Sequence, residues 1–465
     1  MKFENKTYDE LELGDRADLE RICMEDDLYV FANASGNYNP MHLAEYDGDG
    51  DGTPEAVAPA LWLGSLISAV LGNILPGAGT LYRSQNFEFL AHAHAGDRLR
   101  AQVEVVEKRD GNEVLMATEV NRIGDGKTLL RGQAVVIAPA KKQSFDGLEV
   151  PGLVVQRHRH FGKLIEQAEH LPPLPTAVVA PEEPNSLGGA LLAGKHSIIE
   201  PILVGHADRI GAVATELGES LDDIEIIDVR NHRDAARLAV DCVTQGRADA
   251  LMKGHLHTDV LMRAALRKNR GLRVGRRFTH VFVMDVPGLS HPLLVTDAAI
   301  NIQPDLITKK DIVQNAIDLA LSIGIREPKV GVLSAVETVT PEIVSSIDAA
   351  LLSKMAERGQ ITGGLVDGPL AMDNAVNLAA ARTKGLRSPV AGRADVFVVP
   401  DIDAGNMLSK QLTYIAKAEA AGVVLGAKVP IILTSRADDD MARLASCAVA
   451  ALHNEHRTSA GKAPE

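Results

Sequence analysis

The sequence predicts an α+β domain followed by a larger α/β region with mostly parallel sheets. Three observations support this prediction. The chain has 465 residues, more than one hydrophobic core usually holds, so several domains are expected. Its first part contains one long uncharged segment followed by segments in which apolar and polar residues alternate. The rest of the chain instead alternates short apolar runs with helical stretches.

The first domain has its most apolar segment at residues 56–82, which carry no charge. Pro59, Gly64 and other breakers interrupt this segment, so we expect a buried helix at about 60–74 rather than a membrane span. Alternation with period two then predicts antiparallel strands separated by the turns DGN and GDGK. One long buried helix against consecutive long strands is the outline of a hotdog fold. The predicted strands are 98–108, 113–123 and 129–138.

The second region begins after a polar linker that contains proline and glycine. Its β-rich runs recur with helical stretches between them, which predicts βαβ units and a largely parallel sheet covered on both faces. Ligands of such sheets bind beyond the carboxyl ends of the strands. The expected boundaries are 1–140 for the first domain, 141–151 for the linker and 152–465 for the second region, with subdomain I at about 152–295 and 430–465 and subdomain II at about 296–429.

The composition narrows the classes of function. Lys and Arg number 48 against 62 Asp and Glu, a net charge of −14, and aromatic residues make up 3%, so nucleic acid is an unfavourable partner. Small anionic metabolites remain compatible. The three cysteines form no CxxC pair, which argues against disulfides and zinc knuckles and favours a reducing cytoplasm. The N-terminus lacks the pattern of a secretory signal, and no membrane partner is expected.

The DGDGDG motif resembles the start of a calcium-binding loop. Asp47, Asp49 and Asp51 occupy its first three ligand positions, but the twelfth, which should be a bidentate Glu, is Ala58. We therefore expect a solvated acidic loop and no metal.

The run Gly189-x4-Gly194-Lys195 approaches the phosphate loop of nucleotide hydrolases. His196 stands where a Ser or Thr should hold magnesium, and the intervening ALLA favours a helix over an open loop. We expect a helix here and no nucleotide hydrolysis.

One dense basic run lies between Arg267 and Arg277. Its ordinary interpretation is a solvated face or a partner contact. The alternative is a site for the phosphates of an anionic cofactor, for which Arg276 and Arg277 are the candidates.

Polar residues also gather at the ends of four predicted strands. Ser435 and Arg436 follow one of them, and this pair suits a phosphate or an acyl phosphate, because guanidinium binds two oxygens and the hydroxyl a third. The other candidates for substrate binding are Lys253, His255, His257 and Thr258 on one turn, Arg263 on the helix after it, and Asp297, Asp401, Gly405, Asn406 and Lys410.

The motifs PILVG, MKGHLHT, VTDAAIN, GPLAMDNA, SPVAGRADVFVVPDIDAGN and VPIILTSRAD follow one another across residues 152–465. Their order and spacing resemble the phosphate acetyl/butyryltransferase family, and GHLHT and TSRAD are closer to its butyryl branch. The resemblance implies a two-subdomain α/β enzyme, usually dimeric, of phosphotransacylase type. Such an enzyme interconverts acyl-CoA and phosphate with acyl phosphate and CoA, so CoA is a substrate and no cofactor is permanently bound.

The same resemblance implies catalytic roles for particular residues. Ser435 and Arg436 match the family's active-site pair, and Arg263 matches its second substrate-binding arginine. The acetyl branch has an Asp six residues beyond the first arginine as a candidate base, but this position is Ala442 here. One of the three aspartates at 438–440 is the alternative base.

The segment FANASGNYNPMHLAEY resembles the signature of MaoC-type enoyl-CoA hydratases, which are hotdog enzymes that activate water with an Asp and a His. His42 matches, but Asn37 replaces the Asp, and an amide cannot accept a proton as a carboxylate does. Pro59 and Ala60 also replace the family's His-Gly pair. Two interpretations remain: a working or weak hydratase, and a module that binds CoA thioesters or dimerises.

Together the two resemblances imply a bifunctional protein that handles CoA thioesters in the cytoplasm. The expected partners are acyl-CoA, phosphate, acyl phosphate and further copies of the chain, as a homodimer or a higher homo-oligomer. The rival function is a regulatory protein that binds acyl-CoA without catalysis.

Overall fold

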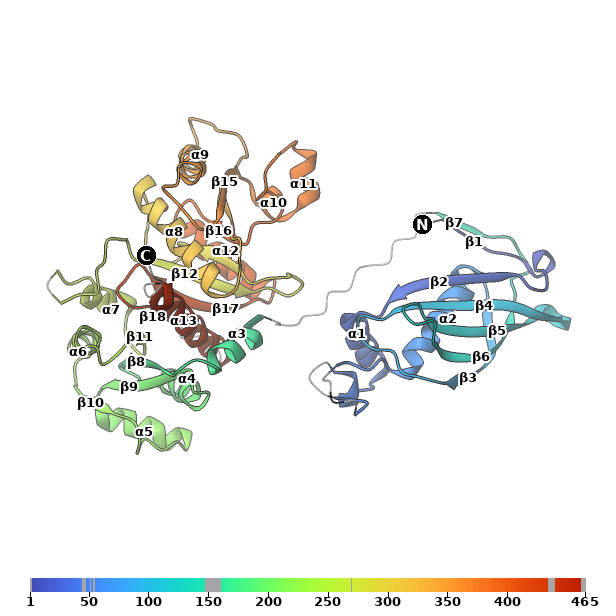
Figure 1. Cartoon of the computed structure of the whole chain (residues 1–465), viewed down its shortest axis with the longest axis horizontal. Helices are drawn as coiled ribbons and strands as arrows, with labels where there is room; N and C mark the ends of the chain where they lie inside the picture. Colours follow the sequence, from blue (N-terminus) through green and yellow to red (C-terminus); the bar gives the residue numbers. More distant parts are fainter. Residues whose placement is uncertain are drawn as a thin grey trace. The chain divides into compact units, whose positions relative to one another are not determined.

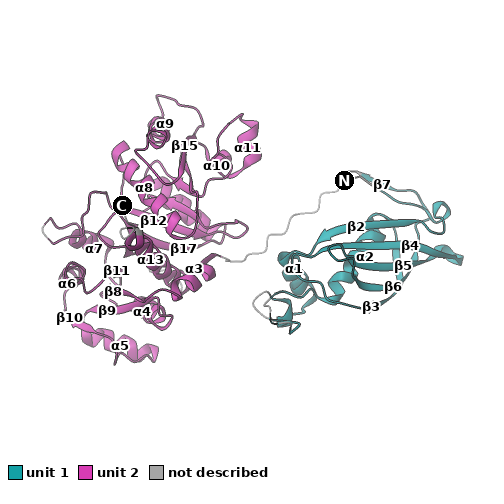
Figure 2. Ribbon diagram, viewed as in Figure 1, with its two compact units in different colours: residues 1–155 teal, residues 156–465 magenta. Residues whose placement is uncertain are grey.

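The computed structural model describes residues 2–43, 47–50, 52, 55–146, 160–268, 270–433 and 440–460. The chain forms two compact units, Met1–Val155 and Gln156–Glu465 (Figure 2). Each unit has hydrophobic clusters of its own, so each is described separately.

The first unit is a five-stranded antiparallel sheet packed against one long helix (Figure 1). The strand order is β2-β4-β5-β6-β3, and fully buried residues alternate with less buried ones along β4 and β5, as the period-two pattern requires. This confirms the hotdog fold. The bounds are β2 (Arg16–Ile22), α2 (Ala60–Asn73), β3 (Leu81–Phe89), β4 (Arg98–Arg109), β5 (Glu113–Arg122) and β6 (Thr128–Ile137).

Helix α2 is apolar because the sheet covers it. Trp62, Ile67 and Leu71 are among its buried residues. A Cβ on Gly64 would lie 2.6 Å from the ring of Phe87, so only glycine lets this ring approach the helix. Within the described parts of the chain, no helix combines the length and the apolar character needed to cross a membrane.

Shorter elements complete the first unit. Strands β1 (Lys2–Glu4) and β7 (Ser144–Asp146) pair as a separate two-stranded antiparallel sheet. The other elements are η1 (Tyr8–Glu10), α1 (Glu25–Ser35), η2 (Pro40–His42) and η3 (Asp110–Asn112).

The second unit is built on one continuous sheet of order β10-β9-β8-β11-β18-β17-β12-β13-β16-β14-β15. Five neighbouring strands, β10-β9-β8-β11-β18, are parallel to one another, and so are the four strands β13-β16-β14-β15. The pairs between these two groups, β18-β17, β17-β12 and β12-β13, are antiparallel. The prediction of mostly parallel strands is confirmed. The bounds are β8 (Leu174–Val179), β9 (Ile199–Gly205), β10 (Ile226–Asp228), β11 (Ala250–Lys253), β12 (Thr279–Asp285), β13 (Leu293–Thr296), β14 (Lys329–Leu333), β15 (Leu365–Leu370), β16 (Val396–Val398), β17 (Glu419–Leu425) and β18 (Ile431–Ile432).

Helix α13 links the hydrophobic clusters of the second unit. It packs against α3, α4, α8, β17 and β18, and its apolar residues belong to two different clusters. The helices are α3 (His160–Glu169), α4 (Pro184–Lys195), α5 (Ala207–Leu217), α6 (His232–Thr244), α7 (Thr258–Ala265), α8 (Leu306–Ser322), α9 (Val344–Glu357), α10 (Met372–Val376), α11 (Leu378–Thr383), α12 (Ile402–Tyr414) and α13 (Asp440–Ala460).

The glycine motif that approaches a phosphate loop lies inside helix α4, as the helix-forming residues between its glycines predicted. A Cβ on Gly189 would lie 2.7 Å from the side chain of Arg443 on α13. This glycine therefore permits close packing of the two helices.

Candidate functional site

The first unit brings Asn37 and His42 together through a tight turn. Helix α1 ends at Gly36, whose φ of 71° is the left-handed conformation that glycine adopts without strain. The side chain of Asn39 then accepts the N–H of Met41 at 3.3 Å and starts the 3₁₀ turn that carries His42. This turn buries the imidazole and faces it towards Asn37.

Two hydrogen bonds define the state of His42. Nδ1 lies 2.7 Å from the carbonyl oxygen of Val57, which can only accept, so Nδ1 carries the proton. Nε2 lies 3.3 Å from Nδ2 of Asn37, while Oδ1 of Asn37 accepts the N–H of Asn39 at 3.3 Å. In this tautomer the Nε2 lone pair meets an amide donor.

Pro59 and Ala60 occupy the beginning of helix α2. Pro59 is the N-cap, and its carbonyl oxygen accepts the N–H of Trp62 at 2.8 Å. The first N–H groups of a helix have no partner within the helix and carry partial positive charge, which suits a developing oxyanion. This end of α2 begins only three residues after Val57, the residue that holds His42.

In the second unit, Lys253 and His255 lie at the carboxyl end of β11. The chain turns there at Gly254, where a Cβ would lie 2.3 Å from the carbonyl oxygen of Val179. Lys253 is buried, and Nδ1 of His255 lies 2.5 Å from Oε1 of Glu183. A cation and an imidazole are thus held beside the end of the neighbouring strand β8.

Glu182, which follows β8, is a residue that the sequence analysis missed. Its side chain is only 3% exposed and accepts from the N–H of His206 at 3.2 Å, from Arg209 at 3.0 Å and from His232 at 3.3 Å. Burial raises the pKa of this carboxyl group, but the hydrogen bonds outweigh burial and the pKa lies below its usual value. The run APEE after a strand was the available signal.

The candidates after β11 continue onto helix α7. His257 is the N-cap of α7 and Thr258 its first residue. Arg263 is 77% exposed and pairs with Asp259 one turn earlier at 3.0 Å. To bind an anionic substrate, its guanidinium would exchange this weak surface pair for the substrate.

Asp297 follows β13 and organises a buried turn. Its carboxylate accepts the N–H groups of His280, Ala299 and Ile300 at 2.9–3.2 Å and Nδ2 of Asn301 at 2.6 Å. These contacts satisfy the carboxylate inside the protein, so Asp297 supports the turn in addition to its expected role in substrate binding.

His280 is a second residue that the sequence analysis missed. It is fully buried beside Asp297, and its ring contacts Phe282 at a centroid distance of 4.4 Å. Burial lowers the pKa of His280 to about 4, although the nearby Asp297 carboxylate acts in the opposite direction. The imidazole is therefore neutral near pH 7.

Helix α12 carries the remaining candidates of this group. Asp401 is its N-cap and accepts the N–H of Ala404 at 2.9 Å. A Cβ on Gly405 would lie 2.6 Å from the carbonyl oxygen of Asp297, so glycine lets the helix pass close to that turn. Asn406 and Lys410 lie on the exposed side of α12, one turn apart.

The candidates divide between the two edges of the sheet. Strands β11 and β18 run in one direction, whereas β13 and β16 run in the other, because three antiparallel pairs lie between the groups. The residues after β11 and β18 therefore leave at one edge, and those after β13 and β16 at the opposite edge. The structure brings Asp297 and Gly405 together, and Lys253 and His255 form a separate group.

The basic run is partly neutralised within the chain. Arg267 pairs with Asp241 at 2.9 Å, and Arg276 pairs with Asp318 and contacts Asn315. The side chain of Arg277 is in an exposed position beside it.

Ser435, Arg436, Asp438 and Asp439 lie outside the described residues. Asp440, the remaining alternative base, is the first residue of α13 and is exposed. Ala442 is buried in the first turn of the same helix.

Comparisons with known proteins agree with this division of the chain. The Phosphate acetyl/butaryl transferase family matches residues 229–451, and the MaoC like domain matches residues 6–125. The phosphate acetyltransferase of Rhizobium meliloti is 56% identical over 300 residues, which are 64% of this chain and 95% of that protein. The phosphate butyryltransferase of Clostridium acetobutylicum is 40% identical over 294 residues, which are 63% and 98%. A crystal structure of a branched-chain phosphotransacylase from Enterococcus faecalis V583 has a TM-score of 0.54 and 29% identity, covering 61% of this chain and 99% of that one.

Fold and relatives together define the second unit as a phosphate acyltransferase. The chain belongs to the phosphate acetyl/butyryltransferase family. A MaoC-like domain precedes this region in the same polypeptide.

Proposed function

We propose that the second unit transfers an acyl group between CoA and phosphate, with Ser435 and Arg436 at the reacting centre. The observation that supports this proposal is the parallel pairing of β11 with β18, which aligns Met252 with Ile432. Strand β18 therefore ends at the same sheet edge as β11, and Ser435 follows β18 in the sequence. The buried Lys253 therefore lies beside the end of β18.

The proposed reaction follows from charge. The CoA thiolate attacks the carbonyl carbon of the acyl phosphate, the C–S bond forms, the C–O bond breaks, and phosphate leaves. Arg436 and Arg263 neutralise the phosphate oxygens, and the hydroxyl of Ser435 donates to the carbonyl oxygen as it gains negative charge. Cations in the pocket also favour the thiolate over the thiol. No covalent enzyme intermediate is required.

Release of the CoA thiol tests this proposal. The full chain is mixed with acetyl-, butyryl- or a longer acyl-CoA, with and without phosphate, and both thiol and acyl phosphate are measured. We expect thiol release from at least one acyl-CoA only when phosphate is present, with an equal amount of acyl phosphate. Tight acyl-CoA binding without release would instead favour the regulatory alternative, and release without phosphate would indicate a thioesterase.

For the first unit we propose binding of a CoA thioester with impaired hydration. The amide of Asn37 donates to His42, and it cannot take a proton from water. The retained orientation of His42 by Val57 is the observation that favours a weak hydratase as the second candidate.

Self-association is also proposed. Strands β2 and β3 are the two edges of the first unit's sheet, and β3 exposes Leu81, Tyr82 and Phe89. An exposed edge strand with apolar side chains suits pairing with a second copy. Analytical ultracentrifugation tests this, and a monomer at micromolar concentration would exclude it.

The three buried cysteines, Cys23, Cys242 and Cys447, carry no disulfide, which supports action in a reducing cytoplasm.

A further inference from the structure

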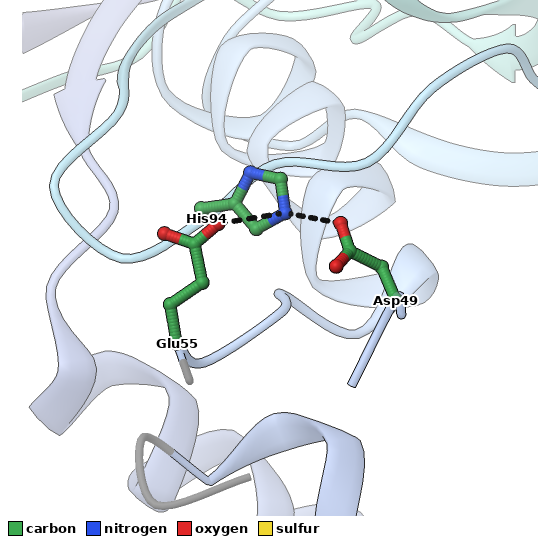
Figure 3. A group of neighbouring side chains, drawn as sticks. All are labelled: Asp49, Glu55 and His94. Atoms are coloured by element: carbon green, nitrogen blue, oxygen red, sulfur yellow. Dashed lines mark hydrogen bonds and ion pairs between the residues drawn. The ribbon is translucent and has the colours of Figure 1, made fainter. Parts of the chain in front are cut away.

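Three side chains of the first unit direct ligand atoms to one point beside the DGDGDG loop. Nε2 of His94 lies 3.0 Å from Oδ2 of Asp49 and 3.4 Å from Oε1 of Glu55 (Figure 3). All three ligand atoms lie within 4.8 Å of one another. The side chains are 17%, 35% and 20% exposed for Asp49, Glu55 and His94, so the group is partly shielded yet open to small ions.

The backbone around this group holds the three side chains in place. Asp47 accepts the N–H groups of Gly50 and Gly52 at 2.7 and 2.9 Å, which closes the loop that carries Asp49. Asp47 also forms a β-bridge with Glu55.

The segment that carries His94 is anchored independently. His94 bridges to Val57, and its N–H is accepted by Asp97 at 2.9 Å. Asp97 in turn pairs with Arg122 at 3.0 Å. Segments far apart in the sequence are therefore fixed beside each other.

We propose that Asp49, Glu55 and His94 bind a divalent transition-metal ion, with Zn²⁺ as the first candidate. Ligand atoms about 2.0–2.1 Å from a tetrahedral zinc ion lie roughly 3.3 Å from one another. The two separations from Nε2 of His94, 3.0 and 3.4 Å, bracket this value. Three protein ligands would leave a fourth position for water.

The donor set distinguishes the proposed ion from calcium. Ca²⁺ takes oxygen ligands, whereas an imidazole nitrogen suits zinc and its neighbours in the first transition row. Asp47 uses both carboxylate oxygens to close the loop, so this first aspartate of the motif is not presented as a calcium loop would present it.

The charge of the group also suits a divalent cation. Two carboxylates close together destabilise each other unless positive charge lies between them. A divalent ion bound between Asp49 and Glu55 would balance both carboxylates. The adjacent Asp47 adds further negative charge to the loop.

The site has a consequence for His42. Val57, two residues after Glu55, bonds His42 through its carbonyl oxygen and donates its N–H to Met41. A metal that joins Glu55 to His94 would clamp the segment that orients this histidine. The proposed ion would therefore hold this segment in place, and its binding does not depend on acyl transfer by the second unit.

Titration of metal-stripped full-length protein with zinc chloride, followed by calorimetry, tests the proposal. A parallel titration with cobalt chloride, a probe for the same site, is followed by the visible absorption of the bound ion. We expect one ion per chain, with no competition from a large excess of calcium. Asp49→Asn, Glu55→Gln and His94→Gln should each weaken binding about 100-fold or more, since even indirect partners of metal ligands affect affinity 10- to 100-fold.

Matched controls separate this site from incidental binding by surface histidines. His92→Gln changes an exposed histidine two residues away, and Asp9→Asn an exposed carboxylate elsewhere in the unit, and both should bind zinc like the unmodified chain. Circular dichroism verifies that each variant is folded. If His94→Gln does not fold, Glu55→Gln still tests the site. Failure of the unmodified chain to bind zinc, or equal binding by the folded ligand variants, would overturn the proposal.

Discussion

The side-chain nitrogen of Asn37 lies 3.3 Å from Nε2 of His42. A carboxylate at the same position could accept a proton from water, whereas the amide can only donate a hydrogen bond to the ring. The two residues thus keep the geometry of an acid–base pair, while one of them lacks the required chemistry.

Asn37→Asp should restore that chemistry. We expect the rate of crotonyl-CoA hydration to rise about 10²- to 10⁴-fold, the contribution typical of a positioned acid or base. Loss of the enoyl absorbance measures the rate in the full chain. His42→Ala added to the same variant should abolish the gain. Rapid hydration by the unmodified protein would contradict the proposed impairment.

Arg436→Ala should reduce acyl transfer at least tenfold in kcat/KM. A charge-assisted contact to phosphate contributes about 1.5–3 kcal/mol, and contacts made only in the transition state add to this. Arg436→Lys should also be poor, because an ammonium does not reproduce the planar fork. Arg358→Ala, at an exposed helix end, is the control. Unchanged kinetics of Arg436→Ala would remove this residue from the mechanism.

Neutralising both Arg276 and Arg277 should raise the KM for CoA several-fold and leave the KM for phosphate nearly unchanged. The pair of Arg276 with Asp318 reduces the first residue's share, so Arg277→Ala alone should produce most of the effect. Arg273→Ala, an exposed change in the same run, is the matched control. Equal effects of all three arginines on both substrates would indicate general electrostatics, and no effect would favour a solvated face.

His280 should make stability depend on pH. Its pKa is about 4 in the folded protein and about 6.5 when unfolded, so the unfolded chain binds a proton that the folded chain does not. The contribution of His280 to the free energy of unfolding is present above about pH 6.5 and is lost as the pH falls towards 4. The loss is about 2 kcal/mol between pH 6.5 and 5. Urea unfolding at these pH values should show a smaller loss for His280→Gln, whereas His92→Gln should match the unmodified chain. Identical slopes for His280→Gln and the unmodified chain would contradict the assignment.

Local patterns were enough to predict the long helix and three of the strands of the first unit. Helix α2 begins and ends within one residue of the predicted 60–74, because Pro59 precedes it and Pro76 and Gly77 follow it. The three predicted strands follow from alternation that a half-buried sheet requires. The continuous sheet of the second unit was not predicted, since its order depends on pairing between strands far apart in the sequence.

The candidate sites show the same limit. His280 lies in the apolar run THVFVMD, where its neighbours predict an ordinary core strand, and its partner Asp297 is 17 residues away. Glu182 was within reach, because a carboxylate directly after a buried strand needs partners. The sequence did not reveal that Asp49 lies beside His94, which depends on the folded loop.

The place of β18 has a consequence for synthesis of the chain. This two-residue strand lies between β11 and β17, although nearly the whole polypeptide precedes it. The sheet of the second unit is incomplete until residue 432 has left the ribosome. Until then, the edges of β11 and β17 that later pair with β18 remain unpaired. The first unit, whose strands all come from residues 2–146, can fold while the second is still being translated. A nascent chain stalled shortly before β18 should therefore resist protease in its first unit and remain sensitive throughout the second.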